Sequence, residues 1–336
     1  MALGRASVRP LLVALACAAT VAGFETWRAL TPTPAAAAGP RVVDIPAQQG
    51  VLAIARRLRD AEVIPSAEAF VALGVVRGTA RSLRAGEYEF PPGTTTVSAL
   101  RMLENGKVRL HPVLHPEGST VAELARTIDR QGLAPAAEIL RVAGDAAFLH
   151  SVGIEARSLE GYVFPDTYYF TRGLSAEQIL TRTVQRLHAK LTPEILARAR
   201  ARGLEIHALL TLASIIEREA VVHDERRLIS AVFWNRLQLG MPLQADPTVQ
   251  YAVGKERRAL TRADLASDDP FNTYTHTGLP PGPIASPGLA AIEAALDPAP
   301  VNYLYFVAID DHRHHFSTTV AEHNLAVARY RLARTR

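Results

Sequence analysis

The chain has 336 residues, of which 48% are hydrophobic and 21% charged, so it is long and apolar enough for two or three folded domains and is not a disordered protein. Its net charge of +4 is spread over many arginines, and no nucleic-acid-binding motif accompanies it, so nucleic acid is not the expected partner. A modest positive charge of this kind still fits an anionic surface or polymer. The single cysteine, Cys17, excludes a disulfide framework and a cysteine-based zinc site.

The N-terminal segment predicts a membrane anchor. Residues 1–10 form a short basic tail, and residues 11–30 form an apolar run that is long enough, marginally, to span a bilayer. Arg5 and Arg9 precede the run, so the positive end is expected in the cytoplasm and the rest of the chain outside it. The expected location is therefore the inner membrane, in a single pass, with the bulk of the chain in the periplasm.

Two alternatives to the anchor are a cleaved signal peptide and a lipoprotein signal. The small residues Ala35–Ala38 suit a cleavage site, but they lie far beyond the apolar run. The residues before Cys17 fit a lipoprotein signal poorly. Residues 31–40, rich in Pro and Ala, predict a linker that leads away from the membrane.

Residues 41–115 contain a repeated pattern. A short strand, a Pro/Gly turn and a short amphipathic helix recur three times, in segments that begin near Ile45, Phe90 and Leu114. Small strand-turn-helix units of this kind resemble LysM-type glycan-binding modules. A generic α+β spacer is the alternative.

Residues 116–336 open with helices and then an aromatic and acidic loop. The segment 159–168 places aromatic rings and two carboxylates within ten residues, and Gly161 and Pro165 preclude a regular helix, so a loop or an edge strand is expected. Aromatic rings beside acids are common where proteins contact sugars. Glu160 is the candidate for a functional side chain here.

Residues 209–220 predict an amphipathic helix with two acids at the flanks of its apolar face. Glu219 is expected to lie deeper than Glu217, because Leu212 and Ile215 precede it by seven and four residues. A carboxylate held against aliphatic side chains loses hydration, which raises its pKa and suits a general acid near neutral pH. The alternative is a surface helix whose acids pair with nearby arginines.

Residues 224–239 predict a second helix, with Asn235 in the middle of its apolar stripe. A buried Asn needs hydrogen-bond partners, so Asn235 either orients a catalytic carboxylate or links parts of the core. Asp246 is expected to cap the following helix, with Pro247 at its first position. That interpretation leaves Gln244 free to contact a ligand.

The segment 271–288 predicts a long ordered loop, and such loops in compact domains are usually functional. Asn272 and Tyr274 offer hydrogen-bond donors, without a nucleophile-base pair. Ser286, followed by Pro287, is expected to cap the next helix, which runs to Leu296. The histidine-rich turn 311–315 invites a metal site, but successive residues of a turn point apart, which favours a solvated turn.

Five segments resemble conserved blocks of the YceG-like endolytic murein transglycosylase family. They are Leu159–Tyr168, Ala213–Glu219, Phe233–Leu237, Leu243–Val249 and the loop from Asn272 to Gly288. The resemblance runs in order from about residue 41 to the end of the chain. It implies an α+β protein with an N-terminal membrane helix, a LysM-like α+β subdomain at 41–115, and a mixed α/β catalytic domain at 116–336 whose active site lies on the acidic helix.

The resemblance also implies a chemistry. Glu219 matches the catalytic acid of the family, and the substrate implied is the glycan strand of peptidoglycan, cut at MurNAc-GlcNAc β-1,4 bonds to leave 1,6-anhydroMurNAc ends. No second carboxylate is required, in agreement with the absence of a clean Asp/Glu pair around the helix, and neither metal nor organic cofactor is needed. The partners implied are enzymes of peptidoglycan synthesis. The residues expected to position substrate or to hydrogen-bond the acid are Glu160, Glu217, Asn235, Gln244, Asn272 and Tyr274.

Two other classes of function stay open. A hydrolytic muramidase would use the same acid together with a base for water, and would leave reducing MurNAc ends. A non-catalytic peptidoglycan-binding scaffold would account for the repeats and the long loop, and would not depend on Glu219.

Overall fold

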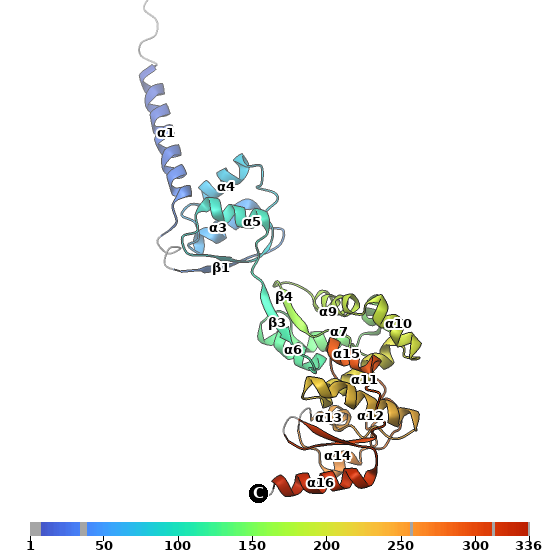
Figure 1. Ribbon diagram of the computed structural model, residues 1–336. Helices are drawn as coiled ribbons and strands as arrows, with labels where there is room; N and C mark the ends of the chain where they lie inside the picture. The colour runs from blue at the N-terminus through green and yellow to red at the C-terminus, as the bar shows by residue number, and fades with distance from the viewer. Residues whose placement is uncertain (1–7, 34–38, 256–257, 311–312, 335–336) are drawn as a thin grey trace, which may run out of the picture. The chain divides into compact units, whose positions relative to one another are not determined.

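The computed structural model describes residues 8–33, 39–255, 258–310 and 313–334 (Figure 1). Helices and small two-stranded sheets alternate along the chain. The chain divides into two compact units. Unit 1 is Met1–His111 with Thr171–Gly173, and unit 2 is Pro112–Phe170 with Leu174–Arg336.

The first element, helix α1, runs from Val8 to Leu30 and covers the predicted anchor at 11–30. It is long and apolar enough to cross a membrane, and the segment Leu11–Arg28 is not buried against the rest of the protein. A signal sequence meets the same criteria. Most of the predicted tail at 1–10, half of the predicted linker at 31–40, and the alanines at 35–38 lie outside the described residues.

Unit 1 is a two-stranded sheet covered by three helices. Strands β1 (Arg41–Ile45) and β2 (Gly86–Phe90) pair antiparallel, with Val43 opposite Tyr88. The inward side chains of both strands pack against helices α3 (Val51–Asp60), α4 (Ala67–Val76) and α5 (Thr96–Asn105). The predicted alternation of strand, turn and helix is confirmed in this unit.

The third strand-turn-helix repeat consists of β3 (His111–His115) and α6 (Val121–Arg130). Strand β3 pairs with β4 (Asp166–Phe170), so this repeat builds a second small sheet. A capping box between Thr120 and Glu123 starts α6. The neighbouring helices are α7 (Ala136–Ala143), α8 (Ala146–Ser151), α9 (Ala176–Lys190) and α10 (Pro193–Ala201).

Helix α11 (Ile206–Glu219) is the central helix of unit 2. Every residue from Leu209 to Glu217 is buried, and the helix packs against α15 (Leu289–Leu296). The remaining elements are η1 (His223–Glu225), α12 (Arg226–Gln238), α13 (Asp246–Ala252), α14 (Arg262–Leu265), β5 (Tyr305–Ala308), β6 (His314–Ser317) and α16 (Val320–Arg334). Strands β5 and β6 form the expected hairpin, and Thr319 caps α16 through Glu322.

Two predicted helix caps are wrong, and each of these side chains has another partner. Asp246 is the first residue of α13, its backbone cap is Ala245, and its carboxylate accepts a hydrogen bond from Tyr274. Helix α15 begins at Leu289 and not at Ser286, whose hydroxyl pairs with the buried ring of His115 at 2.8 Å. Tertiary contacts decide the partners of these short polar side chains.

Candidate active site

The candidate acid Glu219 lies at the last turn of α11, where the buried helix leaves the core. The helix ends because Ala220 adopts an extended conformation, with φ −79° and ψ 115°. Glu217 is buried, whereas Glu219 is only partly buried. The end of α11 thus places one carboxyl at the boundary between the core and an accessible space.

The environment of Glu219 raises its pKa to about 8. The largest cause is burial, which removes water from the charged form, and the second is the negative charge of Asp246. Arg218 acts in the opposite direction. At neutral pH the Glu219 carboxyl therefore carries its proton, as a general acid requires.

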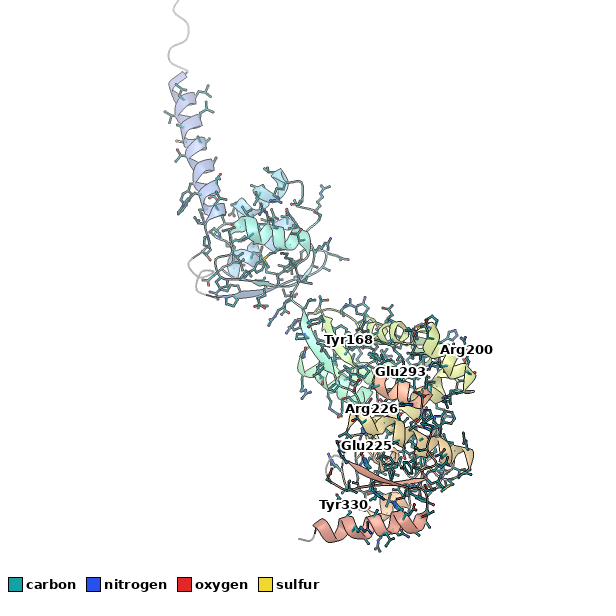
Figure 2. The ribbon with its side chains drawn as sticks, in the orientation of Figure 1. Tyr168, Arg200, Glu225, Arg226, Glu293 and Tyr330 are labelled. Carbon is teal, nitrogen blue, oxygen red and sulfur yellow. The ribbon has the colours of Figure 1, made fainter. Side chains whose placement is uncertain are left out.

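Two pockets of unit 2 meet at Glu219 and Asp246. The larger has a volume of 1090 Å³, and the smaller has a volume of 380 Å³. Besides the two shared acids, the larger is lined by Arg236, Leu243, Gln244, Tyr274, Tyr305, Phe306, Val307, Ala308, His314, Val320, His323, Val327 and Tyr330, and the smaller by Glu117, Gly118, Glu217, Arg218, Pro247 and Gln250. A chain-like ligand could therefore lie on both sides of the acid. Tyr330, on α16, is labelled in Figure 2.

Asp246 is the functional candidate that the sequence analysis treated as a helix cap. Its carboxylate accepts a 2.5 Å hydrogen bond from the Tyr274 hydroxyl. Burial and this carboxylate raise the pKa of Tyr274, so Tyr274 stays a hydroxyl donor. The sequence shows no clean Asp/Glu pair around the acidic helix, but the fold places one there, because α13 begins with Asp246 beside the end of α11.

Glu217 has a different environment from Glu219. Its carboxylate pairs with Arg226 at 3.1 Å and accepts a hydrogen bond from the Gly288 backbone N–H at 3.0 Å. Arg226, labelled in Figure 2, begins α12, and Gly288 caps α15, so this one acid of α11 joins three helices. The predicted order of depth is reversed, because Glu217 faces this ion pair in the core and Glu219 faces the pockets.

Gln244 and Tyr274 share the larger pocket with Glu219, and Glu217 shares the smaller one. Gln244 has a left-handed backbone, with φ +51°, and its backbone N–H donates to Thr273. Its side-chain oxygen accepts from Arg236 at 3.1 Å. Gln244 is exposed, so its side chain is accessible within the larger pocket.

Asn235 links two segments of the core and does not line either pocket at Glu219. Its amide donates to the carbonyl oxygens of Val301 and Tyr303, at 3.0 and 2.9 Å. Of the two roles left open for this residue, the contacts support the structural one. They attach the segment before β5 to α12.

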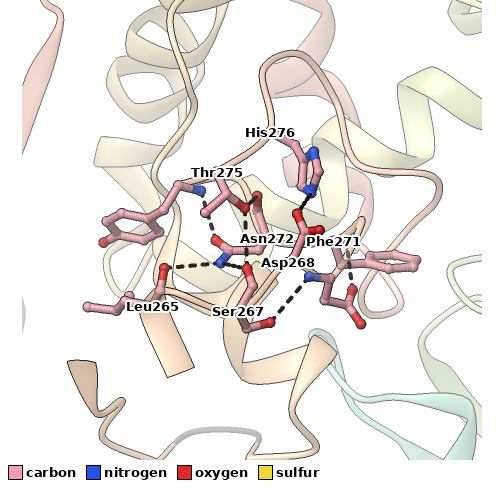
Figure 3. A network of polar contacts seen from close by, with 9 residues as sticks. Leu265, Ser267, Asp268, Phe271, Asn272, Thr275 and His276 are labelled. Carbon is pink, nitrogen blue, oxygen red and sulfur yellow. Dashed lines mark hydrogen bonds and ion pairs between the residues drawn. The ribbon is translucent and has the colours of Figure 1, made fainter. Parts of the chain in front are cut away.

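Asn272 organises the start of the long loop (Figure 3). It is fully buried, donates to the carbonyl oxygens of Leu265 and Ser267, and accepts from the Tyr274 backbone N–H. These contacts do not reach Glu219. Asn272 instead fixes the backbone of Tyr274, whose side chain lines the larger pocket.

Glu160 lies at the N-terminus of α6. Its carboxylate accepts from the Val121 backbone N–H, at 3.2 and 3.3 Å, where the helix dipole favours negative charge. The adjacent Gly161, with φ +79°, touches the long loop so closely that a Cβ would come within 2.2 Å of Pro283. Glu160 lies outside the residues that line the two pockets at Glu219.

Among the described residues, no group of three or more His, Cys, Asp or Glu side chains could hold a metal ion. In the predicted histidine turn, Asp311 and His312 lie outside the described residues. His314 belongs to β6, where its Nδ1 lies 2.7 Å from the Glu225 carboxylate.

Comparisons with known proteins agree on one family. The sequence profile of the YceG-like family matches residues 43–329. An endolytic murein transglycosylase of Bacillus subtilis is 33% identical over 304 residues, which cover 86% of this chain and 84% of that protein. One of Streptococcus pneumoniae is 29% identical over 280 residues, 74% of this chain but only 51% of that protein. The crystal structure of a YceG-like protein from Listeria monocytogenes is 34% identical, with a TM-score of 0.62, and the match covers 86% of this chain and 99% of that one.

The ion pair of Glu217 predicts a stability effect. Replacing Glu217 by Ala removes the 3.1 Å partner of Arg226, which keeps Glu117 at 3.9 Å, and the acceptor of the Gly288 N–H, so unit 2 should lose about 3 kcal/mol of stability. Urea unfolding of the chain in detergent, followed by the fluorescence of Trp234 in a Trp27→Phe background, measures this loss. Glu217→Gln keeps an acceptor for Gly288 and should lose less. Unchanged unfolding midpoints in both variants would contradict the structural role.

Proposed function

The chain belongs to the YceG-like family, and we propose that it is an endolytic murein transglycosylase, which cuts β-1,4 bonds between MurNAc and GlcNAc inside peptidoglycan strands. The observation that carries this proposal is a carboxyl protonated at neutral pH, Glu219, at the meeting point of two pockets. Relatives with this name support the substrate class. The site geometry supports Glu219 as the acid.

The proposed reaction needs one acid that then serves as a base. Glu219 donates its proton to the glycosidic oxygen while the bond to the anomeric carbon breaks and positive charge develops on the sugar ring. The resulting carboxylate accepts the proton of the C6 hydroxyl of MurNAc, whose oxygen closes on the anomeric carbon. A 1,6-anhydro ring forms, Glu219 regains its proton, and no water is consumed.

Asp246 has an electrostatic role in this proposal. Its negative charge holds the proton on Glu219 before substrate binds, and the hydrogen bond from Tyr274 fixes where that charge lies. The same charge faces the region in which the sugar becomes positive. Asp246 therefore favours both the protonated acid and the developing cation.

The two pockets support cleavage within a strand. An enzyme that cuts only at chain ends can close one side of its site, whereas an endolytic enzyme must hold sugars on both sides of the bond. The 1090 Å³ pocket offers Tyr274 and Tyr305 as aromatic surfaces for one side. The 380 Å³ pocket, which includes Arg218 and Gln250, accepts the other side.

A hydrolytic muramidase is the second candidate, and the proximity of Asp246 to Glu219 favours it. In such an enzyme Asp246 would activate water, and the product would carry a reducing MurNAc end. Mass spectrometry of digested glycan strands separates the two reactions. Anhydro ends support the transglycosylase, and reducing ends overturn it.

The remaining parts of the proposal concern location. Helix α1 is proposed as a single-pass inner-membrane anchor, with both units in the periplasm. Residues 41–115 are proposed as a LysM-like module for glycan, on the basis of the repeated strand-turn-helix pattern. Enzymes that polymerise peptidoglycan remain the expected partners.

Replacing the acid tests whether the site is catalytic. Glu219→Gln keeps the size of the side chain but cannot transfer a proton, so the rate of strand cleavage should fall about 100- to 10,000-fold. The release of soluble fragments from purified glycan strands measures the rate. Because Glu219 lies outside the ion pair of Glu217, the unfolding midpoint should not fall. Equal activity of wild type and variant would support the scaffold alternative.

The pH profile tests the role of Asp246. Since the pKa of Glu219 is raised to about 8, cleavage should fall as the pH rises through that value and the acid loses its proton. Asp246→Asn removes a charge that raises this pKa but keeps an acceptor for Tyr274, so the alkaline limb should move to lower pH. A pH profile of cleavage for wild type and variant checks the shift. An alkaline limb at the same pH in both proteins would contradict the electrostatic role.

A further inference from the structure

One helix of unit 1 has an apolar outer face. In α4, the exposed positions are Glu68, Ala72, Val75 and Val76, whose spacing places them on one side of the helix. Val75 is 62% exposed and Val76 is 84% exposed. A face that meets water is ordinarily polar, but the last two turns of this face carry no charge. Such a face indicates contact with an apolar medium.

The opposite face of α4 fixes the orientation of the helix. Ala67, Ala69, Phe70 and Gly74 are buried in the core of unit 1. The N-terminal cap, in which Ser66 accepts from the Ala69 backbone N–H, fixes the start of the helix. The helix cannot rotate its valines inward without exposing Phe70.

The membrane-crossing candidate α1 contacts α4 directly. The C-terminal end of α1 contacts α4 and α5, while most of the helix stays exposed (Figure 1). At the end of α1, Arg28 donates to the Pro65 carbonyl at 2.6 Å, two residues before α4 begins. Just beyond it, Thr33 donates to the Glu62 carbonyl at 2.6 Å. The point where α1 ends is thus attached to the loop that leads into α4.

We infer that α4 is a membrane-contacting helix, which inserts Ala72, Val75 and Val76 into the surface of the lipid bilayer beside α1. The inference rests on the proposed anchoring by α1 and deepens it. The contact of α1 with α4 brings the apolar face to the bilayer surface, and helices of this type lie about 5–10 Å into the boundary between headgroups and acyl chains. Exposed Arg81, which follows Val76 by five residues, suits anionic headgroups, whereas Arg77 pairs with Glu104 at 3.0 Å.

The second contact with lipid would limit the motion of unit 1. An anchor of one helix leaves the attached domain free to rotate about the axis of that helix. A second contact with the bilayer, through the outer face of α4, would prevent this rotation. Unit 1 would then be held against the bilayer in one orientation. The lipid surface, and not a second protein, is the partner that the uncharged valines and their neighbour α1 favour.

Fluorescence quenching by lipid tests the inference on the full chain. Val76→Cys in a Cys17→Ser background is labelled with a polarity-sensitive fluorophore and reconstituted in vesicles of phosphatidylcholine and phosphatidylglycerol, with or without bromine on the upper part of the acyl chains. We expect brominated lipid to remove most of the Val76→Cys emission. Val42→Cys is the matched control, because Val42 is a 47% exposed valine of β1 whose neighbours Val43 and Ile45 point to the opposite, helix-covered face.

Label on the native Cys17 separates this inference from the anchoring. Quenching at Cys17 and at Val76→Cys, but not at Val42→Cys, supports the inference. Quenching at Cys17 with no more quenching at Val76→Cys than at Val42→Cys overturns it and leaves the anchor intact. No quenching at Cys17 refutes the anchor and this inference together. Ala72→Cys, on the same face, should behave as Val76→Cys does.

Discussion

The site depends on the loss of water around one carboxyl group at the end of a buried helix. Helix α11 is covered from Leu209 to Glu217, and its last turn brings Glu219 to the edge of that core. Burial alone favours the neutral acid, and the charge of Asp246 acts in the same direction. The fold of unit 2 holds the end of α11 next to the start of α13.

Two acids separated by one residue illustrate how position decides function. Glu217 is the more buried, yet an ion pair with Arg226 and a backbone N–H compensate its charge. Glu219 faces a carboxylate and a pocket, and its burial and the charge of Asp246 outweigh the favourable charge of Arg218. Burial that is compensated gives a structural link between helices, and burial that is not compensated gives a carboxyl that keeps its proton at neutral pH.

The long loop supports the site mainly by its attachment to the buried side of α11. Ile284 donates its backbone N–H to the Ser214 hydroxyl, and Gly288 donates to Glu217, so the loop and the residue that caps α15 are attached to the buried side of α11. Only its first part reaches the pocket, where Asn272 fixes the backbone that carries Tyr274. Three hydrogen bonds attach the later part of the loop to α11, from Ile284, from Gly288 and between Pro281 and His207.

The sequence by itself determined the strand-turn-helix repeats, the central helix and the choice of Glu219, because these depend on local periodicity, on turn residues and on the resemblance to a known family. It did not determine that Glu217 is more buried than Glu219, or that Asp246 lies close to Glu219. Helical spacing cannot show that Arg226 and Gly288 meet Glu217, nor that Tyr274 binds a side chain that resembles a helix cap. Those contacts join residues distant in the chain, so only the packing of α11, α12, α13 and the long loop could decide them.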